Sequence, residues 1–181
     1  GRRFIGYDVN KKNVERTREV MKEHFEEDKF QLFHGDGVTL EEFKDQSEIL
    51  DAVINDPPYI LKNERYNPTS EIDLSNLDVD EFMERIEYNF KQLYRLIKTS
   101  DFKKKTFYPV ITKVGTGRRG NQGIYDMDLE FQLAAKRAGF VLHDKLFNQL
   151  HSPWGAVNWE RNYINKYVMK NYETNLVFMK F

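Results

Sequence analysis

The stretch LDAVINDPPY (Leu50–Tyr59) places a short apolar run directly before two consecutive prolines. An apolar run of this length, here Leu50–Ile54, is typical of a buried β-strand. The strand must end at the prolines, because each proline ring fixes φ and removes a backbone N–H donor. We therefore expect Asp56 to lie at the carboxyl end of a buried strand.

Strand-like and helix-like segments alternate along the rest of the chain. Asn10 and Asp80 are placed to cap helices, and Gly139 is placed to end one. The expected strands are 4–7, 30–33, 50–54, 106–112, 140–147 and 175–178, and the expected helices lie within 11–25, 81–97 and 129–138. This alternation predicts an α/β sandwich built on a mostly parallel sheet. Pro109 argues against a fully paired central position for the strand that contains it.

The length and composition favour one folded domain, 1–181. The chain has 181 residues, of which 40% are hydrophobic and 31% are charged. No apolar run is long enough to cross a membrane. Cysteine is absent, which excludes disulfides, thiolate catalysis and cysteine-based zinc sites within the sequence and fits a cytoplasmic location. The four histidines lack metal-ligand spacing, so we expect no metal site.

The overall charge argues mildly against nucleic-acid binding by the whole surface. The 28 basic residues nearly cancel the 29 acidic ones, so any such binding must come from a local patch. Arg118 and Arg119 lie in a Gly- and Asn-rich loop that suits phosphate contacts. Trp154 and Arg161 lie in an irregular aromatic and basic stretch that suits base stacking. A solvated loop and a small satellite core are the alternatives.

The residues Asp56, Pro57, Pro58 and Tyr59 together suit the recognition of an amino group. Pro57 pushes Asp56 towards extended geometry, and neither proline has an N–H. The loop therefore offers only acceptors, namely the Asp56 carboxylate and backbone carbonyls, while Tyr59 offers a ring on which a base can stack. The alternative is a turn with two prolines in which Asp56 caps a loop or a helix.

This tetrapeptide resembles the catalytic motif of the S-adenosylmethionine-dependent amino-methyltransferases, which methylate adenine N6 or cytosine N4 in DNA. The resemblance implies a Rossmann-like methyltransferase sandwich, S-adenosylmethionine as the cofactor, and DNA with a flipped-out adenine as the partner. Asp56 at the first position favours adenine, because serine is commoner there in the cytosine enzymes. The adenine amino nitrogen is a poor nucleophile, so acceptors that hold its protons would direct its lone pair at the methyl sulfonium.

The resemblance extends to two further strand ends. It implies that Asp8 binds the ribose hydroxyls of the cofactor and that Val9 lies against the cofactor's adenine. It also implies that Asp36, followed by Gly37, accepts a hydrogen bond from the cofactor's adenine amino group. Considered alone, Asp8 could instead cap a helix, and Asp36 could form a tight turn.

One part of the family pattern is absent. The family's glycine-rich loop, which holds the methionine half of the cofactor, should precede Arg3, whereas Gly115–Gly117 falls after the strand expected at 106–112. Family topology puts the absent strand between the strands that end at Asp8 and Asp56. We therefore expect 1–181 to be part of a longer protein or to be completed by a partner chain. Those two strands should either flank a vacancy or pair directly with each other.

Three other functions stay open at this point. An RNA adenine methyltransferase could use a similar pocket. A protein glutamine methyltransferase could too, although its motif usually begins with asparagine, which Asp56 disfavours. The absent glycine-rich loop also allows a catalytically impaired methyltransferase-like fold that binds nucleic acid or a partner subunit.

Overall fold

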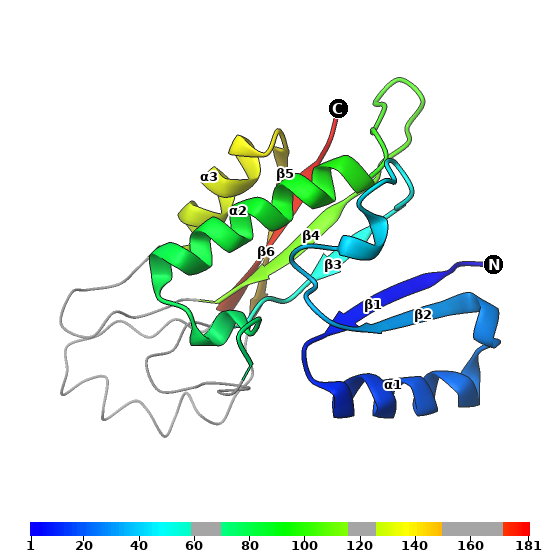
Figure 1. The fold of residues 1–181 in the computed structure, drawn as a ribbon. Coiled ribbons are helices and arrows are strands. Elements are labelled where there is room, and N and C mark those ends of the chain that lie inside the picture. Colours follow the sequence, from blue (N-terminus) through cyan, green and yellow to red (C-terminus); the bar gives the residue numbers. More distant parts are fainter. Residues whose placement is uncertain (59–69, 116–125, 150–171) are drawn as a thin grey trace.

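The computed structural model describes residues 1–58, 70–115, 126–149 and 172–181, and their strands fall into two sheets (Figure 1). The strands are β1 (Phe4–Asp8), β2 (Phe30–His34), β3 (Val53–Asn55), β4 (Val110–Val114), β5 (Val141–Gln149) and β6 (Tyr172–Met179). The α-helices are α1 (Lys11–His24), α2 (Val79–Leu96) and α3 (Met127–Arg137). Short 3-10 turns lie at η1 (Glu27–Lys29), η2 (Glu41–Phe43) and η3 (Leu74–Asn76). This arrangement confirms the α/β class.

The larger sheet has the strand order β3-β4-β6-β5. β3 and β4 are parallel, whereas β6 is antiparallel to both of its neighbours, β4 and β5. β3, β4 and β5 therefore share one direction, and β6 alone runs against them. The smaller sheet pairs β1 with β2 in parallel, from Phe4 opposite Phe30 to Asp8 opposite His34.

α2 and α3 pack against the four-stranded sheet to form the core (Figure 1). On α2, the predicted apolar face is confirmed, since Phe82, Ile86 and Phe90 are all buried at helical spacing. Phe90 lies at the centre of this core. Its ring centroid is 5.4 Å from that of Phe178 on β6 and 6.3 Å from that of Phe131 on α3. The core thus forms between the helices and the sheet.

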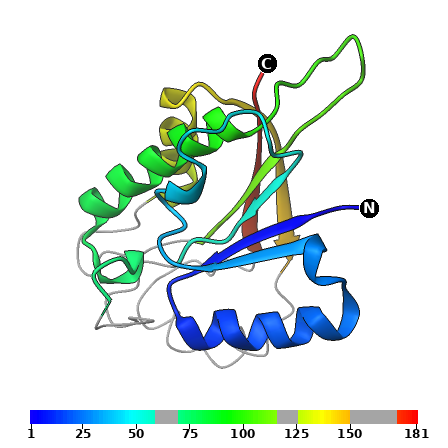
Figure 2. The ribbon, with the colours of Figure 1, turned by 45° about the vertical axis from the view of Figure 1, so that its right-hand side comes forward.

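α1 lies on the side of the β1–β2 pair that is turned away from α2 and α3 (Figures 1 and 2). Asn10 caps α1 as expected, because its side chain accepts a hydrogen bond from the backbone N–H of Lys12. The expected cap of α2 is wrong by two residues. Asp78, and not Asp80, accepts at 2.9 Å from the backbone N–H groups of Asp80 and Glu81.

The strand expected at 106–112 begins later than expected. Asp101 and Thr106 pair with each other through two backbone hydrogen bonds that close a turn over residues 102–105, and β4 begins only at Val110. β4 is nevertheless a central strand, flanked by β3 and β6. Pro109 is compatible with this position because it precedes the strand and contributes only its carbonyl, which accepts from Val53 N at 3.0 Å. The expectation drawn from Pro109 was therefore wrong for β4.

The described residues place β1 and β3 in different sheets. β1 pairs with β2 and β3 pairs with β4, and within these ranges no ladder joins β1 to β3. Direct pairing of the strands that end at Asp8 and Asp56, one of the two expected arrangements, is therefore absent from the described part of the chain.

Gly139 ends α3 as expected, with a φ of +105° that side chains other than glycine's rarely allow. A Cβ atom here would also lie 3.0 Å from two ring carbons of Tyr94. We expect Gly139→Ala to lower the free energy of unfolding by about 1–2 kcal/mol, measured by urea denaturation. Gly35→Ala is the matched control, because its Cβ would meet nothing within 4 Å. Equal losses in the two variants would contradict the strain assigned to Gly139.

Candidate active site

The candidate active site lies where β1, β2 and β3 end. Asp56 directly follows β3, and its side chain is 54% exposed. The ends of these three strands point the same way in Figure 1. Pro57 and Pro58 follow with half-buried side chains. Tyr59, the last member of the motif, lies outside the described residues.

Asp8 is the last residue of β1, and Asp36 lies two residues after the neighbouring strand β2. The Asp8 carboxylate accepts from Asn10 N at 2.7 Å and from Asn13 Nδ2 at 3.1 Å, so it orders the connection into α1 without being its cap residue. Val9, which follows Asp8, is half-buried, and its carbonyl lies 3.2 Å from a ring nitrogen of His34. Both Asp8 and Val9 are therefore placed at the expected strand end.

Asp36 forms the tight turn that the sequence left open as an alternative. One carboxylate oxygen accepts from Val38 N at 2.8 Å, and the other forms an ion pair with Arg85 of α2. The Asp36 side chain is only 14% exposed. Gly37 packs closely, since a Cβ there would lie 3.1 Å from the Cβ of Tyr7. A larger residue at position 37 would therefore press on β1.

Asn89 of α2 connects this turn to the end of β3. Its buried side-chain nitrogen donates to the carbonyls of Gly37, at 3.0 Å, and Val38, at 3.1 Å. Its oxygen accepts from Asn55 Nδ2 at 3.4 Å, one residue before Asp56. The Asn89 amide thus fixes the turn that contains Asp36 and Gly37, the candidate cofactor contacts, relative to Asp56, the candidate catalytic residue. Sequence reasoning missed Asn89, and its single local signal was a polar residue between Ile86 and Phe90 on an apolar helix face.

We expect Asn89→Ala to lower the free energy of unfolding by about 1–3 kcal/mol, because the Gly37 and Val38 carbonyls would lose a buried donor. Chemical denaturation of the full-length protein measures this loss. Glu84→Ala is the control on the same helix, since Glu84 is exposed, and it should change stability by less than about 0.5 kcal/mol. An Asn89 variant as stable as the control would show that the amide does not hold the turn.

Tyr7 connects β1 to η2 and β2. Its hydroxyl donates to Glu42 Oε2 at 2.7 Å, and its ring stacks on Phe33 with a centroid separation of 5.0 Å. Burial, together with the hydrogen bond to Glu42, raises the pKa of Tyr7 above its ordinary value. Tyr7 therefore stays protonated and keeps donating to Glu42 throughout the physiological pH range.

Among the described residues, Asp56, Lys113 and Glu173 form a cluster of charged side chains. Lys113, near the end of β4, places its Nζ 3.4 Å from Asp56 Oδ2 and 3.1 Å from Glu173 Oε2 of β6. The sequence gave no sign of the contacts of Lys113 with Asp56 and Glu173, because these residues are distant along the chain.

The four nucleic-acid candidates, Arg118, Arg119, Trp154 and Arg161, lie outside the described residues. Within the described ranges, no group of His, Asp and Glu side chains could hold a metal ion. None of the helices in these ranges is long and apolar enough to cross a membrane.

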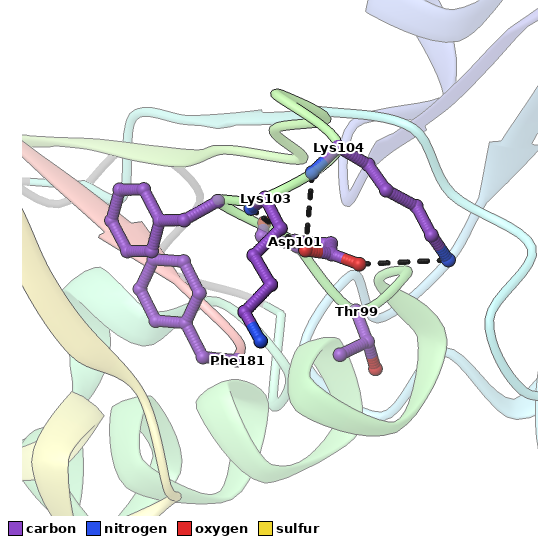
Figure 3. Close-up of a pocket in the computed structure, with 7 residues that line it drawn as sticks. Thr99, Asp101, Lys103, Lys104 and Phe181 are labelled. Atoms are coloured by element: carbon purple, nitrogen blue, oxygen red, sulfur yellow. Dashed lines mark hydrogen bonds and ion pairs between the residues drawn. The ribbon is translucent and has the colours of Figure 1, made fainter.

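A hollow lined by 99–104 and Phe181 lies away from this site (Figure 3). Asp101 closes its turn by accepting from the backbone N–H groups of Lys103 and Lys104, and Phe181 stacks on Phe102 at 4.5 Å. These residues precede β4 or follow β6, whereas Asp56 and Lys113 lie at the opposite end of the sheet. The hollow therefore contributes nothing to the candidate active site.

No family model matches the chain, and no curated protein matches it either. Solved structures do match it. TTHA0409 of Thermus thermophilus, assigned as a DNA modification methylase and solved with S-adenosyl-L-methionine, is 16% identical with a TM-score of 0.53, covering 81% of this chain and 53% of that one. The cytosine-N4-specific PvuII DNA methyltransferase is 17% identical with a TM-score of 0.58, covering 81% of this chain and 48% of that one. The chain has the Rossmann-like methyltransferase fold.

The methyltransferase fold does not determine the reaction by itself. The [4+2]-cyclase SpnF is also similar, at 11% identity and a TM-score of 0.58, covering 99% of this chain and 67% of that one. The chain spans about half the length of TTHA0409 and of the PvuII enzyme. The reaction must therefore be argued from the residues of the site.

Proposed function

We propose that the chain provides the target-base pocket, and part of the cofactor site, of a methyltransferase that modifies the N6 amino group of adenine in DNA. The position of Asp56 carries the proposal. Its carboxylate is partly exposed, directly follows β3 and precedes two prolines. Ligands of open α/β sheets bind outside the carboxyl ends of the strands, which is where Asp56 lies.

The residues at the ends of β1 and β2 support S-adenosylmethionine as the cofactor. Each Asp8 oxygen accepts one hydrogen bond from the chain, and a carboxylate can accept about four in all. Asp8 therefore keeps acceptors for the ribose hydroxyls, and Val9 offers an apolar surface beside them. Asp36 fits less directly, because its side chain is only 14% exposed and one of its oxygens forms an ion pair with Arg85. The bound cofactor supplies an electrophilic methyl group.

Asp56 would orient and activate the target amine. Its carboxylate accepts a hydrogen bond from one amino N–H, and a carbonyl of the Pro57–Pro58 segment accepts a hydrogen bond from the other. The nitrogen then becomes pyramidal, so that its lone pair is no longer delocalised into the ring and faces the methyl group, while the negative charge of Asp56 stabilises the positive charge that develops on nitrogen. Pro57 and Pro58 hold the acceptors in place because their φ angles are fixed. Tyr59 would stack on the flipped base.

The choice of adenine in DNA rests on two supports. Asp56 at the first motif position favours adenine over cytosine by resemblance to the amino-methyltransferases. DNA is the substrate named for both the PvuII enzyme and TTHA0409, with which the chain shares its fold. The loop residues Arg118 and Arg119 and the aromatic stretch with Trp154 and Arg161 would then contact the DNA around the flipped base.

A comparison of acceptors tests this proposal. The full-length protein is incubated with S-adenosylmethionine carrying a radioactive methyl group and with equal masses of unmethylated plasmid DNA, RNA or a protein mixture. We expect label in DNA. Label confined to RNA or to protein would replace DNA by the corresponding acceptor. Label in none of the three would overturn the assignment as an enzyme and favour a binding role.

A further inference from the structure

The sheet register brings Asp56, Lys113 and Glu173 to one face. Asn55 lies opposite Thr112, so Asp56 follows beside Lys113. Lys113 lies opposite Asn175 on β6, and Glu173, two residues away, shares its face. The neighbouring Thr112 is fully buried, and its strand partner Asn55 contacts α2 through Asn89. Lys113 therefore projects from the opposite face of the sheet.

The two contacts of Lys113 differ in length and exposure. Lys113 is 3.1 Å from Glu173, whose side chain is 21% exposed, and 3.4 Å from Asp56, whose side chain is 54% exposed. Charge-assisted hydrogen bonds of full strength measure about 2.7–2.9 Å. The longer contact with Asp56 therefore restrains the carboxylate while leaving its oxygens able to accept from a substrate.

The charges of the cluster fit this role. An ammonium beside Asp56 opposes the positive charge that develops on the target nitrogen, and Glu173 compensates for that effect. Within the described residues, one cation and two carboxylates leave this cluster net negative, which favours the positive charge that develops on the target nitrogen. Among the described residues, Lys113 alone contacts the Asp56 carboxylate by an ion pair or hydrogen bond.

We propose that Lys113 is a positioning residue that holds the Asp56 carboxylate for the target amine, and that Glu173 anchors Lys113. This inference rests on the proposed function, since it concerns the same pocket. Lys113 acts through Asp56 and touches neither the cofactor nor the reacting atoms. Its loss should therefore lower kcat and leave the affinity for S-adenosylmethionine unchanged.

The test compares Lys113→Met and Lys113→Arg in the full-length protein, with methylation of unmethylated plasmid DNA as the activity. We expect Lys113→Met to lower kcat by about tenfold to a hundredfold, because a small displacement of a reacting group has effects of this size. The KM for S-adenosylmethionine and the thermal midpoint should not change. Lys113→Arg, which keeps the charge, should recover most of the activity. Lys145→Met is the matched control, since Lys145 on β5 pairs with Asp128 at 3.1 Å and is similarly exposed.

The double variant Lys113→Met/Glu173→Gln separates the positioning of Asp56 from the loss of the ion pair with Glu173, because the single variant removes the cation 3.1 Å from the Glu173 carboxylate. We expect the double variant to be as slow as Lys113→Met. Full activity in the double variant, or in Lys113→Met itself, would overturn the role of Lys113 while leaving the proposed function intact. A wild-type protein that methylates no acceptor would overturn both proposals.

Discussion

Replacing Asp56 by alanine should abolish methyl transfer while the affinity for S-adenosylmethionine stays within about twofold of the wild type. The expected loss is large because the Asp56 carboxylate orients the amine and stabilises the charge that develops on it, and losing one such group typically costs about a hundredfold to a thousandfold. Methylation of unmethylated plasmid DNA gives the rate, and calorimetry gives the cofactor affinity. Asp56→Asn, which keeps one acceptor oxygen, should retain more activity than Asp56→Ala.

Asp51→Ala is the matched control for Asp56→Ala. Asp51 lies shortly before β3, its side chain is 74% exposed, and it pairs with Lys98 on the surface. We expect this variant to keep full activity. A rate above a few per cent of wild type in Asp56→Ala would contradict the role of Asp56 as the orienting acceptor. Equal losses in the two aspartate variants would point to a general effect on the fold.

Replacing Asp8 by alanine should weaken cofactor binding by roughly 1–3 kcal/mol, the usual effect of removing a charged hydrogen-bond partner. Calorimetry on the full-length protein measures the dissociation constant. Asp28→Ala is the control, because Asp28 is exposed and precedes β2 instead of following it.

Asn13→Ala distinguishes the two roles of Asp8. Asn13 donates to Asp8 at 3.1 Å, so its loss loosens the connection into α1 but leaves the carboxylate in place. We expect cofactor affinity to remain near the wild-type value in Asn13→Ala. An unchanged dissociation constant in Asp8→Ala would leave Asp8 only the role of ordering this connection.

The sequence predicted the kinds of elements better than their ends. Helix α2 was expected from its apolar spacing, but Asp78 caps it and Asp80 does not. Both residues have the same capping chemistry, so only the backbone geometry distinguishes them. The strand around Pro109 was expected to begin at Thr106, but it begins at Val110. In the structure Phe107 is 42% exposed beside a surface turn.

In the candidate site too, the sequence identified some residues and missed others. Asp8, Asp36 and Asp56 could be identified because each follows an apolar run, which is a local signal. The residues that hold them, Arg85 and Asn89, could not be identified in this way. Both lie on α2, about fifty positions along the chain from Asp36 and Gly37, and only the packing of α2 across the strand ends brings them together.

The identity of the methylated nucleoside tests the central claim most directly. Plasmid DNA from a host without adenine or cytosine methylation is treated with the full-length protein and S-adenosylmethionine, digested to nucleosides and analysed by mass spectrometry. We expect N6-methyladenine in the wild-type reaction and none in the reaction of Asp56→Ala. N4-methylcytosine as the product would contradict the assignment of adenine, and N6-methyladenine formed equally by Asp56→Ala would contradict the assignment of the pocket.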